Sequence, residues 1–211
     1  MSKGQVLTKI TVSFFSKMYL DFDKQLREAL LRRDAFIDRM ISVEIRHLRD
    51  DLAGRRLSDD AHRYISRELK RSGGKVHQKS LALDQRTATT LREVCDEHNL
   101  VRDAFLNRLI ALLRSTDSFL DILELPKRVR SSRIDGTEDM PTSPLKVIEE
   151  TEWDPLYYLR AACHERYERG LYDLPMPSEW IGLSCVLDDD RVPGTLAFAE
   201  REERETLHPL D

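Results

Sequence analysis

The sequence is poor in cysteine and has no long hydrophobic run. Only three of its 211 residues are cysteines, Cys95, Cys163 and Cys185, and none of them forms a CxxC motif. This usage is typical of a reducing compartment and argues against a disulfide-stabilised scaffold. No apolar run approaches the roughly 18 residues that cross a bilayer, and the N-terminal residues lack the apolar core of a signal peptide. We therefore expect a cytoplasmic protein without membrane association.

Motifs of common catalytic and metal sites are also lacking. The sequence contains no phosphate-binding loop and no dinucleotide-binding fingerprint. Cys163, His164 and Cys185 match no spacing of zinc ligands. A buried cysteine beside a solvated histidine is a more common arrangement than a Cys/His nucleophile pair. We therefore predict no enzymatic activity, no catalytic residue, no metal site and no cofactor.

Charge of neither sign dominates the whole chain, but the two signs are unevenly distributed. Residues 1–135 contain 27 basic and 20 acidic residues, a net +7, and residues 136–211 contain 7 basic and 18 acidic residues, a net −11. Together they give the overall net charge of −4. A basic region joined to an acidic one indicates a polyanion-binding part, although two different solvated surfaces would give the same pattern.

An internal repeat is the most informative feature of the sequence. Arg33-Asp34-Ala35-Phe36-Ile37-Asp38-Arg39-Met40-Ile41 returns 69 residues later as Arg102-Asp103-Ala104-Phe105-Leu106-Asn107-Arg108-Leu109-Ile110, with six of nine positions identical. The same offset, without gaps, also aligns apolar residues that precede this segment. Two copies of one unit therefore cover roughly residues 7–52 and 76–115.

Each copy opens with a predicted strand. Lys9-Ile10-Thr11-Val12-Ser13-Phe14 alternates polar and apolar residues, and Gln78-Lys79-Ser80-Leu81-Ala82-Leu83 alternates in the same phase, with Lys79 as the one misfit. The core-facing residues of these strands are expected to be Val12, Phe14, Leu81 and Leu83.

Two predicted helices follow in each copy. The first has about 11 residues, with Asp21 or Asp23 as its cap in the first copy and Asp84 in the second. Its expected apolar face contains Phe22, Leu26, Ala29 and Leu30 in the first copy, and Leu91, Val94 and Cys95 in the second. After a short break comes a longer helix, whose expected apolar stripe contains Phe36, Ile37, Met40, Ile41 and Ile45, and in the second copy Phe105, Leu106, Leu109, Ile110 and Leu113.

One such unit is too small to form a core by itself, so it must pair with another of its kind. Pairing gives an antiparallel two-stranded ribbon above four helices. On its alternating strands and its two Arg-Asp-Ala-Phe helices, the chain resembles the ribbon-helix-helix family of DNA-binding proteins, which includes the Arc- and MetJ-like repressors. The resemblance implies a mainly α fold with a short antiparallel β-ribbon, formed here by two tandem units as a pseudo-dimer within one chain.

The expected organisation has five parts. Residues 1–52 and 76–125 are the two ribbon-helix-helix units, and residues 53–75 join them by a helix that starts at Ser58-Asp59-Asp60. Two chains that exchange units are the competing arrangement. Residues 126–144 are typical of a flexible linker. Residues 145–211 are expected to form a small, acidic α+β lobe, with a helix over Asp154–Tyr172 and a strand at Trp180–Leu187 that pairs with Thr195–Phe198.

The resemblance also implies which residues contact DNA. A two-stranded ribbon fits the major groove, where polar side chains read base edges. The expected base-contacting residues lie on the outward strand face: Lys9, Thr11, Ser13, Gln78, Ser80 and Ala82. The expected phosphate-contacting residues lie at helix starts and strand ends: Lys17, Arg32, Arg33 and Arg102. Asp34 and Asp103 are expected to cap the longer helices or to compensate their dipoles.

The implied function is that of a sequence-specific double-stranded DNA-binding protein, a transcriptional repressor located on the nucleoid of a prokaryote, plasmid or phage. The alternative is an antitoxin-like or assembly protein, whose acidic segment 145–211 binds a partner protein or a second copy of the chain. In that case DNA binding serves autoregulation or the processing of plasmid or phage DNA.

Overall fold

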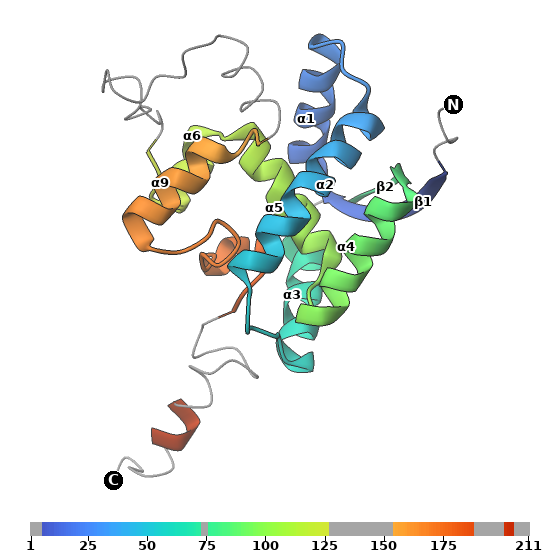
Figure 1. Cartoon of the computed structure of the whole chain (residues 1–211). Helices are drawn as coiled ribbons and strands as arrows, with labels where there is room; N and C mark the ends of the chain where they lie inside the picture. Colours follow the sequence, from blue (N-terminus) through green and yellow to red (C-terminus); the bar gives the residue numbers. More distant parts are fainter. Residues whose placement is uncertain (1–5, 73–75, 127–153, 188–200, 205–211) are drawn as a thin grey trace.

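The computed structural model describes residues 6–72, 76–126, 154–187 and 201–204, and within them the protein is mainly helical with one two-stranded antiparallel sheet (Figure 1). In chain order the elements are β1 (Leu7–Phe15), α1 (Ser16–Glu28), α2 (Arg33–Asp51), α3 (Asp59–Ser72), β2 (Val76–Asp84), α4 (Gln85–His98), α5 (Arg102–Arg114), α6 (Asp117–Ile122), α9 (Tyr157–Tyr167) and the 3-10 helix η1 (Ser178–Leu183). None of the helices in these residues is long and apolar enough to span a membrane.

The sheet joins the two predicted strands within one chain. β1 pairs with β2 so that Thr11 lies opposite Ser80, its own counterpart in the repeat. Lys9 lies opposite Ala82 and Ser13 opposite Gln78, which are also symmetric positions under the 69-residue offset. The strand register therefore has an approximate two-fold relation centred on Thr11 and Ser80.

Side-chain burial alternates along both strands, as the sequence predicts. Val12, Phe14, Leu81 and Leu83 have at most 1% of their surface exposed. The side chains on the other face are exposed at Lys9, Thr11, Gln78 and Ser80 and half-buried at Ser13 and Ala82. The core-facing strand residues are confirmed, because a period of two places alternate residues on opposite faces.

The first helix of the first copy begins earlier than predicted. α1 starts at Ser16, directly after β1, so Asp21 and Asp23 lie inside the helix and do not cap it. Leu30 does not belong to its apolar face either, since it is 92% exposed with a positive φ of 58° just beyond the helix, and Ala29 is also exposed. In the second copy Asp84 does cap α4, because its carboxylate accepts a hydrogen bond from the N–H of Arg86 at 2.8 Å.

Helix α3 connects the two copies, as predicted. Ser58 Oγ accepts a hydrogen bond from the N–H of Ala61 at 3.1 Å, which satisfies one donor of the first turn. The helix buries Ala61, Ile65 and Leu69. It packs closely against η1, where a Cβ atom built on Gly182 would lie 2.9 Å from Leu69 Cα.

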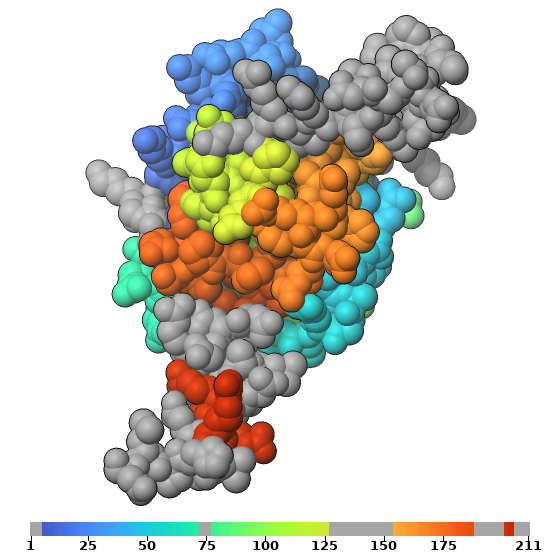
Figure 2. All heavy atoms as spheres, turned by 90° about the vertical axis from the view of Figure 1, so that its left-hand side faces the viewer, coloured from blue at the N-terminus to red at the C-terminus, as the bar shows by residue number. Residues whose placement is uncertain are grey.

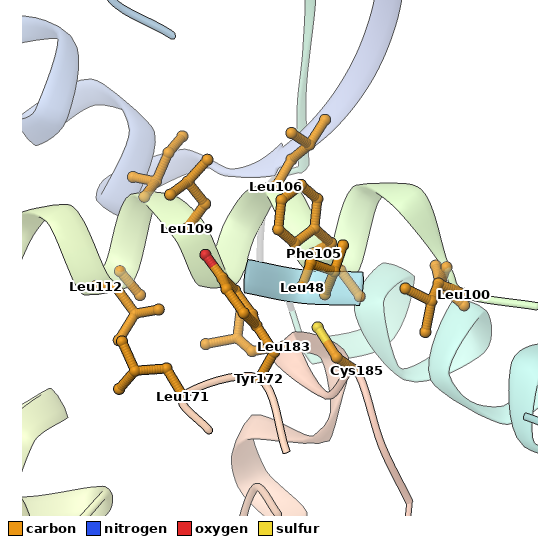
Figure 3. Packing of buried hydrophobic residues seen from close by; sticks show 14 of the residues in the cluster. Leu48, Leu100, Phe105, Leu106, Leu109, Leu112, Leu171, Tyr172, Leu183 and Cys185 are labelled. Carbon is orange, nitrogen blue, oxygen red and sulfur yellow. The ribbon is translucent and has the colours of Figure 1, made fainter. Parts of the chain in front are cut away.

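Helix α5 is the centre of the hydrophobic core. Every residue from Ala104 to Leu112 is buried, including the charged Arg108. Residues 171–187 pack against one side of this helix, and the ring of Tyr172 lies 5.4 Å from that of Phe105 (Figure 3). The Arg108 guanidinium donates hydrogen bonds to the carbonyls of Leu171 and Leu174, so its charged end has partners inside the core.

Residues 154–187, the larger described part of the predicted 145–211 lobe, pack into this core. Leu156, Leu159, Leu174 and Leu183 belong to the same buried cluster as the residues of α2 and α5. Figure 2 shows this segment, in orange, directly beside α6 in yellow-green, where the hydroxyl of Tyr167 donates to the carbonyl of Leu123 at 3.0 Å.

The strand predicted at Trp180–Leu187 is wrong, because residues 178–183 form the 3-10 helix η1. Its apolar residues Ile181 and Leu183 are buried against neighbouring helices, so they are removed from solvent without pairing in a sheet. The predicted helix over Asp154–Tyr172 is confirmed only for Tyr157–Tyr167. The proposed partner strand Thr195–Phe198 and the linker from residue 127 to 144 lie outside the described residues.

Candidate nucleic-acid interface

The six residues predicted to contact bases lie together on the outer face of the ribbon. The strand pairing brings them into three cross-strand pairs: Thr11 with Ser80, Lys9 with Ala82, and Ser13 with Gln78. Four of them are exposed, and the half-buried Ser13 and Ala82 present little side chain to solvent. The face therefore carries one cation, one amide and two exposed hydroxyl groups, which are donors and acceptors of the kind that read base edges.

Arg33 and Arg102 lie against the centre of this ribbon, on opposite sides. Arg33 Nη2 donates to the carbonyl of Ser80 at 3.2 Å, and Arg102 Nη2 donates to the carbonyl of Thr11 at 2.6 Å. The side chains are 30% and 39% exposed. Each arginine therefore contacts the strand of the other copy, while part of its guanidinium faces solvent beside the ribbon.

Each of these arginines is also paired with the aspartate that follows it. Arg33 lies 2.6 Å from Asp34 Oδ1, and Arg102 lies 2.8 Å from Asp103 Oδ1. The pKa of Arg33 is raised: burial lowers it, but the hydrogen bonds and charge interactions with Asp34 and Tyr19 together outweigh that effect. These pairs reduce the positive potential at the ribbon centre, so long-range attraction of an anion depends more on the exposed cations Lys9, Lys17 and Arg32.

The prediction that Asp34 and Asp103 cap their helices or compensate the dipoles misses their main contact. Asp103 Oδ2 accepts a hydrogen bond from the N–H of Ser13 at 2.9 Å, and Asp34 Oδ2 accepts one from the N–H of Ala82 at 3.2 Å. These N–H groups belong to the outer edges of the two strands. Both bonds run from one copy of the repeat to the other.

A second pair of side chains, one turn further along each helix, continues this pattern. Asp38 Oδ1 accepts from the N–H of Asp84 at 2.8 Å, and Asn107 Oδ1 accepts from the N–H of Phe15 at 3.0 Å. Asn107 Nδ2 also donates to the carbonyl of Ser13 at 2.9 Å. Helices α2 and α5 thus satisfy polar groups on both open edges of the ribbon, which otherwise invite pairing with another chain.

Sequence reasoning missed this role of the acidic residues. The signal that could have found it is the spacing of Asp34 with Asp38 and of Asp103 with Asn107, because residues four apart lie on the same helix face. A short acceptor repeated on that face, next to the apolar stripe, is suited to reach the backbone of a neighbouring strand. The result is a ribbon held at its edges and open only on its outer face.

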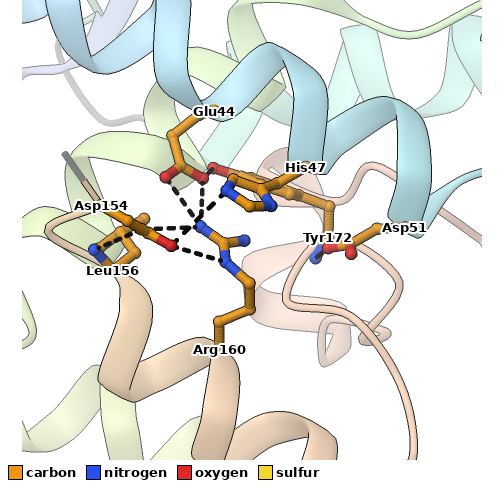
Figure 4. A network of polar contacts seen from close by, with 7 residues as sticks. All are labelled: Glu44, His47, Asp51, Asp154, Leu156, Arg160 and Tyr172. Atoms are coloured by element: carbon orange, nitrogen blue, oxygen red, sulfur yellow. Dashed lines mark hydrogen bonds and ion pairs between the residues drawn. The ribbon is translucent and has the colours of Figure 1, made fainter. Parts of the chain in front are cut away.

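A separate polar network lies on the other half of α2, away from the ribbon (Figure 4). Glu44 is fully buried, accepts hydrogen bonds from Arg160 at 2.9 Å and 3.2 Å, and accepts another from the hydroxyl of Tyr172 at 2.7 Å. Arg160 also pairs with Asp154 at 3.2 Å. Burial raises the pKa of Glu44 and the pKa of Tyr172. The network joins α2 to α9 and to the segment that follows it.

The cysteines are buried and not poised for reaction. Burial raises the pKa of Cys95 to about 12 and that of Cys163 and Cys185 to about 11. A thiol with a raised pKa is a poor nucleophile and a poor metal ligand at neutral pH. Within the described ranges, no group of three or more His, Cys, Asp or Glu side chains is arranged to hold a metal ion.

Comparison of the chain with family models, curated proteins and solved structures finds no match in any of the three. The arguments for a function therefore come from the geometry of the ribbon and the residues around it.

Proposed function

We propose that this protein binds double-stranded DNA by inserting the β1–β2 ribbon into the major groove. The observation that carries the proposal is a two-stranded ribbon whose edges are bonded to helix side chains and whose polar outer face is left exposed. The major groove of B-DNA is wide enough for a two-stranded ribbon, and the exposed Lys, Gln, Thr and Ser side chains suit its donor and acceptor pattern.

The two units act, in this proposal, as the halves of a ribbon-helix-helix pseudo-dimer. The symmetric register about Thr11 and Ser80, and the reciprocal bonds of Arg33 and Arg102, support it. A homodimer presents identical half-ribbons to DNA. Here Lys9, Thr11 and Ser13 are replaced by Gln78, Ser80 and Ala82 in the second half, so the preferred site is expected to be asymmetric.

Phosphate contacts are expected on both flanks of the ribbon. The N-termini of α2 and α5 present backbone N–H groups, a suitable site for an anion. Arg33, Arg102 and the exposed Arg32 stand at these helix starts, and Lys17 lies on the first turn of α1. This division into reading and holding residues is common to sequence-specific DNA-binding proteins, and the role we propose within that class is that of a transcriptional repressor.

A selection from random duplex DNA with the purified full chain tests the proposal. It should yield one enriched, asymmetric site, and binding should weaken steeply with salt, since phosphate contacts release counterions. Lys9→Ala and Gln78→Ala should each cost about 1–3 kcal/mol on the selected site and little on random DNA.

Matched controls are available on α1, outside the ribbon, where Lys24 and Gln25 are exposed. Lys24→Ala and Gln25→Ala should leave discrimination between the selected site and random DNA unchanged. If the selection enriches no sequence, or if the Lys9 and Gln78 variants discriminate as well as the wild type, the ribbon is not a reading element.

A further inference from the structure

The two halves of the repeat differ most in size at Tyr19, whose counterpart 69 positions later is Ala88. In the first copy the ring of Tyr19 stacks on Phe14, with a centroid separation of 4.7 Å, and lies 6.0 Å from the ring of His77. It is buried, with 1% of its surface exposed. Its hydroxyl accepts a hydrogen bond from Nη1 of Arg33 at 2.9 Å. Tyr19 thus fills the space beside the ribbon and holds one of its two flanking arginines.

The second copy has no such ring. The residue 69 positions after Tyr19 is Ala88, and Phe22 is replaced by the smaller Leu91. Arg102 makes the same bonds as Arg33 to its own aspartate and to the opposite strand, through Nε and Nη2. Its Nη1 atom, which corresponds to the one that bonds Tyr19, has no hydrogen-bond partner within the part of the chain that the structure describes.

A pocket of about 420 Å³ lies at this position, among β1, α3, α4 and the start of α5. Its apolar lining includes Ile10, Leu69, Ala88, Leu91 and Leu100. Arg102 lines it as well, and Lys70 and Arg92 come from the two flanking helices. The volume lies in the range of small-molecule sites, and eight of the fifteen lining residues are polar or charged, among them Asp96 and Asp103.

We propose that this pocket binds a small phenol carrying a substituent para to its hydroxyl. Tyr19 is the template for this ligand within the same chain, since its side chain is a para-substituted phenol held by an apolar wall and an arginine. In the second copy the ring of the ligand occupies the space that Ala88 leaves. Its hydroxyl accepts a hydrogen bond from Nη1 of Arg102, and its substituent points away from Arg102.

Such a ligand would act on the ribbon through Arg102, which bonds the carbonyl of Thr11 at the ribbon centre. An effect of the ligand on DNA affinity rests on the proposed function. Binding of the ligand does not, because the pocket and its partners are defined without DNA. The experiment is therefore a binding measurement on the full chain alone.

The probe is p-cresol, which is the free equivalent of a tyrosine side chain, and the matched control ligand is toluene, which lacks the hydroxyl. Calorimetry should show one p-cresol site per chain and about tenfold weaker binding of toluene, as expected for the loss of a hydrogen bond to a charged group. Arg102→Met should lower the affinity for p-cresol to the affinity for toluene. Ala88→Tyr should abolish binding of both ligands, because the chain's own ring then fills the pocket.

Thr89→Tyr is the control variant, since Thr89 is the next residue of α4 and is exposed. It should bind p-cresol as the wild type does. The proposal is overturned if the wild type binds no p-cresol, or if Ala88→Tyr, folded by circular dichroism, binds it unchanged. Where Ala88→Tyr does not fold, equal affinity of the wild type for p-cresol and toluene overturns the proposal.

Discussion

The bond between Asp103 and the edge of β1 offers a direct test of how the ribbon is held. Asp103→Ala removes the acceptor for the N–H of Ser13, which lies 2.9 Å from Oδ2 in a partly buried environment. A buried donor left without a partner costs about 1–3 kcal/mol. The substitution also removes the ion pair with Arg102, but that side chain is 39% exposed, so screening leaves a contribution of a few tenths of a kcal/mol. We therefore expect Asp103→Ala to lower the free energy of unfolding by about 2 kcal/mol.

The equivalent change in the other copy should cost less. Asp34 is 33% exposed against 19% for Asp103, and its bond to the N–H of Ala82 is longer, at 3.2 Å. Asp34→Ala should therefore cost about 1 kcal/mol, since a more exposed donor regains part of its hydrogen bonding from water. The two bonds share no partner, so the double variant should lose the sum of the two costs within about 0.5 kcal/mol.

Urea denaturation followed by circular dichroism measures these free energies of unfolding. Asp60→Ala is the control, because Asp60 is 58% exposed on α3 and pairs only with its neighbour Arg63 in the described contacts. It should change stability by no more than about 0.5 kcal/mol. If Asp103→Ala costs no more than Asp60→Ala, the helix side chains do not hold the ribbon edge.

Two further predictions concern the buried core, and a third concerns pairing of the two units. Burial raises the pKa of Glu44, so the folded state holds this proton more tightly than the unfolded state. The resulting stability is fully present below the unfolded pKa of about 4.5 and is lost as the pH rises through the higher folded pKa. This loss should be absent from the stability–pH profile of Glu44→Gln. Arg160→Ala leaves Glu44 buried without its cation and should cost about 3 kcal/mol in urea denaturation, whereas Arg166→Ala, on the same helix but 53% exposed, should be nearly neutral. Because both strands lie in one chain, the helical signal of the full protein should not change on dilution from micromolar to nanomolar concentration; a dilution-dependent loss would mean that units pair between chains.

The outer face of the ribbon could be predicted because it depends on local order alone. Once Val12 and Leu81 are assigned to the core, alternation places Thr11 and Ser80 on the opposite face, whatever the rest of the chain does. The contacts of Arg33 and Arg102 could not be predicted in this way. Each reaches the strand of the other copy, and such a contact depends on how the two units meet in space.

Two errors along the chain arise where the local sequence does not decide the type or the start of an element. The polar residues Ser16 and Lys17 give no sign that a helix starts directly after β1, so the predicted helix start is placed at Asp21 or Asp23. Residues 180–187 contain apolar residues that suit a strand, but the described ribbon has its edges bonded to α2 and α5. The segment instead buries Ile181 and Leu183 as a 3-10 helix against α3 and α5.

By itself, the sequence determined the repeat, because the two copies can be compared letter by letter. It also determined the two strands with their inward and outward faces, the connecting helix and the cap at Asp84, because each of these elements depends on residues close together in the chain. Only the tertiary structure decided that Asp34 and Asp103 bond the ribbon edges, that residues 154–187 complete the core around α5, and that Ala88 leaves a pocket where Tyr19 leaves none. Those features depend on side chains that are dozens of residues apart and meet only when the two copies pack together.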